Sequence, residues 1–307
     1  MTLNPTEIAR LTRLETEGTD SRYADIDKMS VGELAATMNT ADASVPEAVR
    51  RALPQITSAI EAAVSRMKRG GRMIYVGAGT PGRIGVLDAS ECPPTFGTPP
   101  EQVFAVMAGG PRAIVSPSEG AEDDTEAGTT AMDAAGVGAL DTVIGVASSG
   151  RTPYVVAALE RARANGALTI ALTCNAGTPL SAAAEHRIEV LVGPEVIAGS
   201  TRLKAGTAQK LVLNMFSTIV MVQLGKTYGN LMVDVKPTNA KLRERSLRII
   251  QTVTGAGRTT AAEALAANNH SVKQAIVAIR LNLGPEDAAA QITQNGGRLR
   301  AALGEHA

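Results

Sequence analysis

The sequence predicts an α/β fold: a three-layer αβα sandwich with a five-stranded parallel sheet, followed by a small C-terminal helical module. Five short apolar runs alternate with stretches of helical periodicity, which is the pattern of parallel strands covered on both faces. Two of these runs pass directly into turns rich in glycine, serine and threonine, as strands do at the ligand-binding edge of such sheets. The 307 residues suffice for one large domain and a small addition.

The expected elements follow in order along the chain. Residues 45–67 carry apolar side chains at three- and four-residue steps and predict a helix. Pro153 stands at a first helical position behind Thr152, which predicts a helix over residues 153–162. Further helices are expected over residues 201–226 and 241–254. The strands are expected at residues 73–76, 102–107, 142–147, 168–173 and 187–192.

Composition and punctuation divide the chain into three regions. Residues 1–43 are polar with little periodicity and predict an N-terminal arm. Residues 44–254 hold the strands and form the main domain, which the Gly255-Ala-Gly257 turn ends. Residues 255–307 form a C-terminal helical module with short helical patterns.

The composition argues against several classes of protein. Thirty basic residues balance thirty acidic ones, so no net charge draws the chain to DNA or an anionic membrane. Aromatic residues make up 2%, with no Trp, which argues against a binder of single-stranded nucleic acid. The most apolar run, 211–224, is too short to cross a bilayer. The N-terminus shows no signal pattern, and we expect a cytoplasmic protein.

The cysteines and histidines predict neither disulfides nor a metal site. Cys92 and Cys174 form no C-x-x-C motif, and we expect Cys92 to be a buried, inert thiol. His186, His270 and His306 share no ligand spacing, so no metal is expected.

The first glycine turn, Gly77-Ala-Gly79-Thr80-Pro81-Gly82, formally matches a dinucleotide fingerprint. A nicotinamide site would also need an acid at the end of the second strand, where the sequence has Ala-Gly-Gly110. The chain has no P-loop lysine motif either. An anion-binding loop that uses the start of a helix is the favoured interpretation, with Thr80 as cap and Pro81 at the first helical position.

The second turn combines hydroxyl side chains with a helix start. Ser148, Ser149 and Thr152 offer hydroxyl groups, Gly150 permits unusual backbone angles, and the following helix is expected to supply free N–H groups. These features favour phosphate binding. The alternative is that Thr152 simply caps the helix and the serines solvate the turn. The two turns would face one cleft if the first and third strands were neighbours, an order that the sequence leaves open.

Three charged residues near these turns are candidate site residues. Glu91 precedes Pro93-Pro94, which we expect to end its helix and fix the carboxylate for acid/base work. Glu122 lies in an acidic turn, residues 119–124. The alternative for both is a solvated surface carboxylate. Lys204 lies near a helix start, where a cation opposes the helix dipole and a bound anion would compensate.

Together, these stretches resemble the N-acetylmuramic acid 6-phosphate etherases, a branch of the sugar isomerase (SIS) superfamily. The resemblance covers the chain from about Thr16 to about Arg300. The matching blocks are Thr16-Glu-Gly-Thr19, Val76-Gly-Ala-Gly-Thr80, Gly82-Arg83, Leu87-Asp-Ala-Ser-Glu-Cys-Pro-Pro-Thr-Phe-Gly97, Glu119-Gly-Ala-Glu-Asp123, Ala147-Ser-Ser-Gly-Arg-Thr-Pro-Tyr154, Gly199-Ser200, Lys204-Ala-Gly-Thr-Ala-Gln-Lys-Leu-Val-Leu-Asn-Met215 and Gly229-Asn-Leu-Met-Val-Asp-Val235.

The resemblance implies a fold, a reaction and residue roles. It implies a five-stranded parallel sheet, a three-helix C-terminal module and a homodimer with sites near the subunit boundary. The implied reaction splits N-acetylmuramic acid 6-phosphate into N-acetylglucosamine 6-phosphate and D-lactate without a cofactor. Glu122 would be the base at C2 and Glu91 the acid for departing lactate. The phosphate would be bound by Ser148, Ser149, Gly150 and Thr152 with Gly79 and Thr80 nearby, and Lys204 would contact the sugar or the lactyl carboxylate.

One position departs from the family pattern. The family commonly has Ser after Gly-Ala-Gly-Thr, where this chain has Pro81, which lacks a hydroxyl and an N–H. We expect one phosphate contact to be absent or moved. Two alternatives to the etherase remain at this stage: an aldose–ketose isomerase of phosphosugars, and a regulator that senses a sugar phosphate without turnover.

Overall fold

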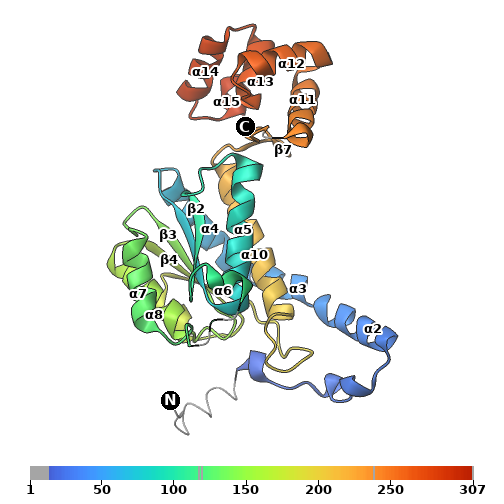
Figure 1. Cartoon of the computed structure of the whole chain (residues 1–307), viewed down its shortest axis with the longest axis vertical. Coiled ribbons are helices and arrows are strands. Elements are labelled where there is room, and N and C mark those ends of the chain that lie inside the picture. Colours follow the sequence, from blue (N-terminus) through green and yellow to red (C-terminus); the bar gives the residue numbers. More distant parts are fainter. Residues whose placement is uncertain (1–13, 117, 119, 238, 306–307) are drawn as a thin grey trace. The chain divides into compact units, whose positions relative to one another are not determined.

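The computed structural model describes residues 14–116, 118, 120–237 and 239–305, which group into two compact units (Figure 1). Unit 1 comprises Met1–Ala89 and Glu101–Ser217, and unit 2 comprises Ser90–Pro100 and Thr218–Ala307. The division therefore falls inside two helices, and not at the Gly255 turn that the sequence suggested. These helices are α5 (Gly79–Phe96) and α10 (Lys204–Gln223).

Unit 1 contains the parallel sheet that the sequence predicted. Its strands are β1 (Met73–Gly77), β2 (Val103–Met107), β3 (Thr142–Val146), β4 (Leu168–Thr173) and β5 (His186–Glu189). Their order is β2-β1-β3-β4-β5, and all neighbours are parallel. The order reverses between β1 and β3, and ligands bind at such reversals, beyond the carboxyl ends of the strands.

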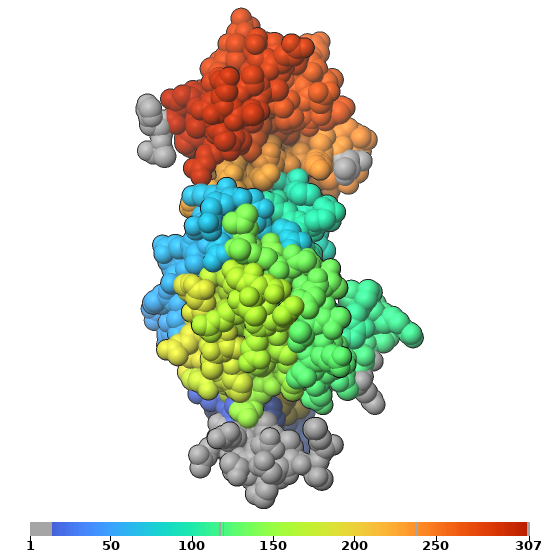
Figure 2. Space-filling model, turned by 90° about the vertical axis from the view of Figure 1, so that its left-hand side faces the viewer, coloured from blue at the N-terminus to red at the C-terminus, as the bar shows by residue number. Residues whose placement is uncertain are grey.

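Helices cover both faces of this sheet, which confirms the three-layer architecture. Figure 1 shows α7 (Thr125–Ala134) and α8 (Pro153–Ala164) on one side, with α4 (Leu53–Met67), α5 and α10 on the other. Figure 2 looks onto the outer surface of the α7–α8 layer, drawn in green to yellow-green. The shorter helices of unit 1 are α6 (Arg112–Val115) and α9 (Pro179–Ala183).

Side chains of β1 alternate between the two layers, as the two-residue period of a strand requires. Ile74 and Val76 are buried in the core that includes the α8 residues. Tyr75 faces α5, because a Cβ on Gly85 would come within 2.9 Å of the Tyr75 Cβ. The glycine thus lets the helix lie close to the strand.

A partly buried ion pair joins β1 and β3 at their amino ends. The Arg72 guanidinium donates to both carboxylate oxygens of Asp141, at 2.9 and 2.6 Å. Burial alone would raise the pKa of Asp141, but the hydrogen bonds and charge of Arg72 outweigh it and hold that pKa below its ordinary value. The pair stabilises the pairing of these strands at the edge opposite the glycine turns.

The N-terminal region is more ordered than the expected arm. Three 3₁₀ turns, Glu15–Glu17, Ser21–Tyr23 and Ile26–Lys28, precede α2 (Val31–Asp42) and α3 (Val45–Arg51). Thr16 is buried, and its Oγ1 accepts a 2.9 Å hydrogen bond from Asn175 Nδ2 beyond the end of β4. Residues 1–13 lie outside the described residues. This region therefore contributes to the carboxyl edge of the sheet.

Two expectations about helices were wrong in detail. The helix expected over residues 45–67 is interrupted at Ala52. A new helix, α4, begins there, with Pro54 in its first turn, where proline is tolerated. Pro93 and Pro94 do not end α5, which continues to Phe96. Each proline removes one hydrogen bond, but both lie in the last turn. Gly97, with φ +63°, ends the helix instead.

Unit 2 contains the three helices expected in the C-terminal module, α12 (Arg258–Ala267), α13 (Val272–Leu281) and α14 (Pro285–Gln294). It also contains α11 (Ala240–Thr254), which the sequence assigned to the main domain. The periodicity did not indicate the two-stranded ribbon β6 (Thr227–Tyr228) and β7 (Leu231–Met232), nor the short α15 (Leu299–Ala302). Within the residues that the structure describes, no helix has the length and apolar character needed to cross a membrane.

Candidate active site

The two glycine-rich turns leave neighbouring strands at the same edge of the sheet. β1 and β3 pair directly, with Gly77 opposite Val146. The turns that follow these residues therefore begin side by side, at the point where the strand order reverses. Their placement fulfils the condition under which both turns face one cleft.

Glu122 lies against the first turn. A Cβ on Gly79 would come within 3.1 Å of Glu122 Oε1, and Gly79 has φ +55°. Both residues line a cavity of about 360 Å³, together with Arg83, Met107 and Asp123 among others. The glycine is needed for its backbone angle and for the space that the carboxylate occupies.

The backbone of Glu122 binds the second turn. Its carbonyl accepts a 3.0 Å hydrogen bond from the N–H of Tyr154, at the start of α8. Gly128 of α7 packs directly on the Tyr154 carbonyl, which leaves no room for a side chain there. One residue of the acidic turn thus contacts both glycine-rich turns. Glu119 of the same turn lies outside the described residues.

Ser148 faces the protein interior. Its Oγ accepts a hydrogen bond from the buried Gln209 Nε2, and its carbonyl accepts one from Asn175 Nδ2, both at 3.0 Å. Ser149 is half-buried and accepts a weak hydrogen bond from the Arg151 N–H, at 3.3 Å. Ser149 is therefore better placed than Ser148 to meet a ligand.

Thr152 occupies the cap position of α8 as predicted, but within the described part of the chain its side chain makes no capping hydrogen bond. The alternative in which Thr152 simply caps the helix is thus not the arrangement observed. The expectation that the start of α8 offers free N–H groups was wrong for its first three residues. Pro153 has none, Tyr154 donates to Glu122, and Val155 donates to the Thr152 carbonyl. An anion must be met by the turn itself.

Gly150 is explained by packing. It has φ +66°, and a Cβ there would collide with the Thr178 side chain, which caps α9. Its carbonyl accepts a hydrogen bond from the Leu180 N–H at 3.0 Å. The turn is therefore fixed against the start of the next helix, which gives Ser149 and Thr152 defined positions.

Glu91 lies on α5, twelve residues after Gly79, and its side chain is exposed. An α-helix rises about 1.5 Å per residue, so roughly 18 Å of helix separate the two positions. Leu87, one turn earlier on the same face, is 52% exposed. Glu91 therefore lies on an outward-facing stripe of α5.

Asp88 is a buried carboxylate that the motif analysis did not single out. It accepts hydrogen bonds from the Tyr75 hydroxyl (2.6 Å), Asn214 Nδ2 (2.7 Å) and the Ser217 hydroxyl (3.1 Å). Burial raises the pKa of Asp88 above its ordinary value. With three donors satisfied inside the protein, Asp88 ties α5 to β1 and α10 within unit 1.

Lys204 starts α10 and is buried, and burial lowers its pKa. Its Nζ donates to the Val192 carbonyl at 2.7 Å. The anion expected at this helix start is supplied by the chain: the Glu195 carboxylate accepts the N–H groups of Lys204 and Ala205, both at 2.9 Å. Lys204 lines a separate cavity of about 290 Å³, and does not line the cavity of Glu122.

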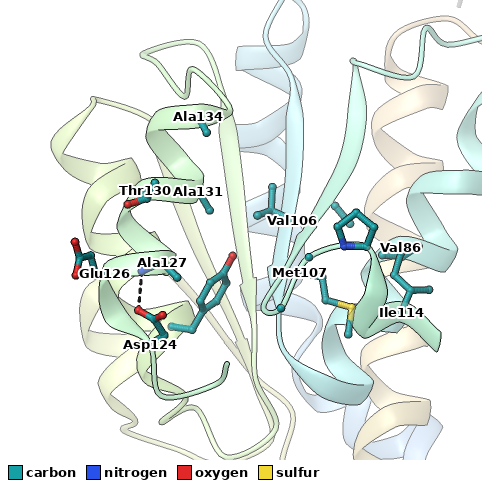
Figure 3. Close-up of a pocket in the computed structure, with 15 residues that line it drawn as sticks. Val86, Val106, Met107, Ile114, Asp124, Glu126, Ala127, Thr130, Ala131 and Ala134 are labelled. Carbon is teal, nitrogen blue, oxygen red and sulfur yellow. Dashed lines mark hydrogen bonds between the residues drawn. The ribbon is translucent and has the colours of Figure 1, made fainter. Parts of the chain in front are cut away.

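A larger cavity, about 780 Å³, lies between β2 and α7 (Figure 3). Its labelled lining is mostly apolar, including Val106, Met107 and Ala131. Asp124 lies at its rim but accepts the Ala127 N–H at 2.8 Å and so caps α7. The smaller cavity is the better candidate site, because the Glu122 carboxylate meets the glycine turn there and, among the described residues, accepts no hydrogen bond.

The cysteines and the described histidines do not line the cavity of Glu122. Cys92 and Cys174 are both buried, and burial raises the pKa of Cys174 to about 12. In the described residues, no three His, Cys, Asp or Glu side chains are grouped to bind a metal. His306 lies outside the described residues.

Comparison with known proteins places the chain in a family. Residues 55–163 match the glucokinase regulatory protein N-terminal SIS domain, and residues 123–219 match the SIS domain. An N-acetylmuramic acid 6-phosphate etherase from Rubrobacter xylanophilus is 55% identical over 96% of this chain and 98% of that protein. The chain belongs to the N-acetylmuramic acid 6-phosphate etherase family. An etherase from Streptomyces avermitilis is also 55% identical, over 96% of this chain and 95% of that protein.

Solved structures with a similar fold are more distant from this etherase-family chain. A phosphoheptose isomerase from Francisella tularensis is 19% identical, with a TM-score of 0.47, over 65% of this chain and 99% of that chain.

Sequence reasoning missed several residues that support the site, although they lie in or near the etherase-family blocks. Tyr154 and Gln209 lie inside two of those blocks, while Asn175 and Glu195 lie outside them. Their roles depend on contacts between distant segments, such as Gln209 with Ser148. An uncommon polar residue inside an apolar helix, as Gln209 is in α10, was the available signal.

Proposed function

We propose that this chain is an N-acetylmuramic acid 6-phosphate etherase, which converts its substrate and water into N-acetylglucosamine 6-phosphate and D-lactate. The observation that carries the proposal is 55% identity with etherases over nearly the whole length of both chains. The cavity beyond the carboxyl ends of β1 and β2 supports it, since the Glu122 carboxylate there lies beside a turn of an anion-binding type. We place the reaction in the cytoplasm, where phosphorylated sugars are retained, with no nucleic-acid or membrane partner.

The chemistry requires two acid/base groups because an unactivated ether is a poor electrophile. In the open-chain sugar, the aldehyde at C1 acidifies the proton at C2, and Glu122 removes it. The C3–O bond then breaks, and Glu91 protonates the departing lactate oxygen. Water adds at C3 of the resulting enal, and a proton returns to C2, so the atoms balance.

We assign phosphate binding to the two glycine-rich turns. The hydroxyl groups of Ser149 and Thr152 and the amides of their turn contact the phosphate, while Gly79 and Thr80 form the neighbouring wall. Ser148 contributes by orienting the turn through its hydrogen bond with Gln209. Lys204 and Glu195 fix the start of α10, which supports the same edge of the sheet.

We propose further that the enzyme is a homodimer whose sites combine two subunits. About 18 Å of α5 separate Glu91 from Gly79, which lies against Glu122. One sugar cannot span that distance between C2 and C3, so the partner subunit's Glu91 completes each site. The exposed stripe of Leu87 and Glu91 on α5 supports such a contact.

Helix α2 supports the dimer independently. Within α2, all of which is described, Ala41 alone is buried, while Val31 is 84% and Met38 39% exposed. Twelve residues are too few for a stable helix without packing, even with the Ser30–Glu33 capping box. A second copy covering this apolar stripe would supply that packing.

Release of D-lactate from N-acetylmuramic acid 6-phosphate tests the reaction. An etherase releases D-lactate and N-acetylglucosamine 6-phosphate in equal amounts. A ketose phosphate without lactate would indicate an isomerase, and binding without turnover would indicate a regulator. Either result contradicts the proposal.

Mixing two inactive variants tests the shared site. Glu91→Gln and Glu122→Gln are each expected to release little lactate as homodimers. After dissociation and reassembly in equal amounts, half of the dimers are mixed, and each has one complete site, so about a quarter of wild-type activity returns. If each subunit holds a complete site, mixing restores nothing. Sedimentation shows whether the species is a dimer.

A further inference from the structure

The end of α5 that carries Glu91 groups with the C-terminal helices. Residues Ser90–Pro100 and Thr218–Ala307 form one compact unit. The helix ends at Gly97, whose N–H donates to the Pro93 carbonyl at 3.0 Å. Whatever fixes Gly97 therefore fixes the last turn of the helix on which Glu91 lies.

Gly97 is held by the backbone of Asp234. A Cβ at Gly97 would collide with the Asp234 carbonyl oxygen, so the two backbone segments touch at van der Waals distance. Val233 and Val235, on either side, are buried in the core formed with α11–α15. The segment that touches Gly97 is therefore part of the C-terminal core.

The side chain of Asp234 is held by a buried lysine. Lys273 Nζ lies 2.6 Å from Asp234 Oδ2 and also donates to the Gly297 carbonyl at 2.6 Å. Lys273 is buried, at 5% exposed. A second cation, Lys226, lies farther from the Asp234 carboxylate, at 3.5 Å. A buried lysine is costly without a countercharge, so this pair fixes residue 234 relative to α13.

We propose that the Asp234–Lys273 ion pair is a positioning device for Glu91. It holds the Asp234 backbone against Gly97, and through Gly97 it holds the last turn of α5. The C-terminal module thereby has a function in the reaction: it sets where the acid for lactate departure stands. This inference rests on the proposed role of Glu91.

The test uses Asp234→Asn and the double variant Asp234→Asn/Lys273→Met, both in the full chain. The double variant removes the buried lysine together with its partner, so it avoids an unpaired buried charge. It is therefore the variant to measure if Asp234→Asn alone does not fold. The matched control is Glu244→Gln/Arg258→Gln, which removes an exposed ion pair of 2.7 Å between α11 and α12. Each protein is measured in two ways.

The first measurement is amide hydrogen exchange, without substrate, in residues 90–100. Exchange there is expected to rise at least about tenfold in the double variant, because its contact segment is loosened, while α7 stays protected. The control should match the wild type. Unchanged protection of residues 90–100 would overturn the proposal, whatever the enzyme's activity.

The second measurement separates the two chemical steps. Lactate release should fall at least about tenfold, since a misplaced catalytic group loses most of its effect. Exchange of the C2 hydrogen with heavy water, which depends on Glu122, should stay within about twofold of wild type. An equal loss of both rates would contradict a role specific to Glu91. If wild-type enzyme released no lactate, the proposed function would fail, while the amide exchange result would still stand.

Discussion

The backbone carbonyl of Glu122 and the backbone N–H of Tyr154 are joined by a hydrogen bond of 3.0 Å. This bond fixes the acidic turn to the start of α8, while the Glu122 side chain lies beside Gly79. The proposed base is thus held by main-chain contacts to one strand–helix turn and packed against the other. A group held in this way reaches the same point of a bound sugar in each turnover.

Ser149→Ala should raise KM about tenfold or more, since a hydrogen bond to a charged group contributes about 1.5–3 kcal/mol. The melting temperature should not change, because Ser149 makes one weak internal hydrogen bond among the described residues. Steady-state kinetics and thermal unfolding measure the two effects. Ser148→Ala is the comparison: it leaves the buried Gln209 amide without its acceptor and should lower stability by about 1–3 kcal/mol. An unchanged KM in Ser149→Ala would rule out the turn as the phosphate site.

Gly79→Ala should lower kcat because the new methyl group displaces the Glu122 carboxylate. It should also cost about 1–2 kcal/mol of unfolding free energy, since φ is +55°. Gly136→Ala is a matched control with φ +57°, where a Cβ would meet no described atom within 4 Å. The control should lose the same stability and keep its kcat. Equal kcat values in the two variants would show that Glu122 is not the group displaced.

Pro81→Ser should lower KM severalfold, because it restores an N–H and a hydroxyl in the first turn of α5. A slight loss of stability is expected, since proline restricts the unfolded chain. Pro285→Ser, in the first turn of α14, should show a similar loss of stability with no change in KM. A KM that does not respond to Pro81→Ser would mean that the first turn of α5 does not contact the phosphate.

Asp141→Asn should reduce the free energy of unfolding by about 2 kcal/mol at neutral pH, since it breaks a mostly buried ion pair. The folded pKa of Asp141 lies below the ordinary value of 3.8. The contribution of Asp141 to the free energy of unfolding is therefore complete above pH 3.8 and is lost as the pH falls through the folded pKa. Urea unfolding at several pH values should show that the unfolding free energies of the variant and the wild type begin to converge below about pH 4. A difference that persisted in acid would argue against the ion pair as the cause.

The sequence predicted β1 to β4 well because each is a short apolar run bounded by glycine or polar residues, whereas β5, expected at residues 187–192, spans His186–Glu189. β4 was predicted over the residues observed, and β3 within one residue of its end. The strand order could not be predicted from the sequence, since it depends on packing between segments far apart in the chain. The same limit applies to Gln209 and Ser148, which are 61 positions apart.

Local rules misled where tertiary contacts override them. Pro93 and Pro94 normally end a helix, yet Asp234 packs on Gly97 beyond them and the helix continues to that point. Lys204 suggested a bound anion at a helix start. The anion is Glu195, supplied by a loop whose conformation the sequence pattern does not encode.

The aromatic composition has a practical consequence at the start of α8. The chain has no tryptophan, and the Tyr154 ring lines the apolar cavity while its N–H binds Glu122. A single tryptophan introduced beside it, at Thr130 on the cavity wall, would be the sole indole in the molecule. Excited where tyrosine absorbs little, its fluorescence would report changes in the surroundings of this apolar cavity in real time.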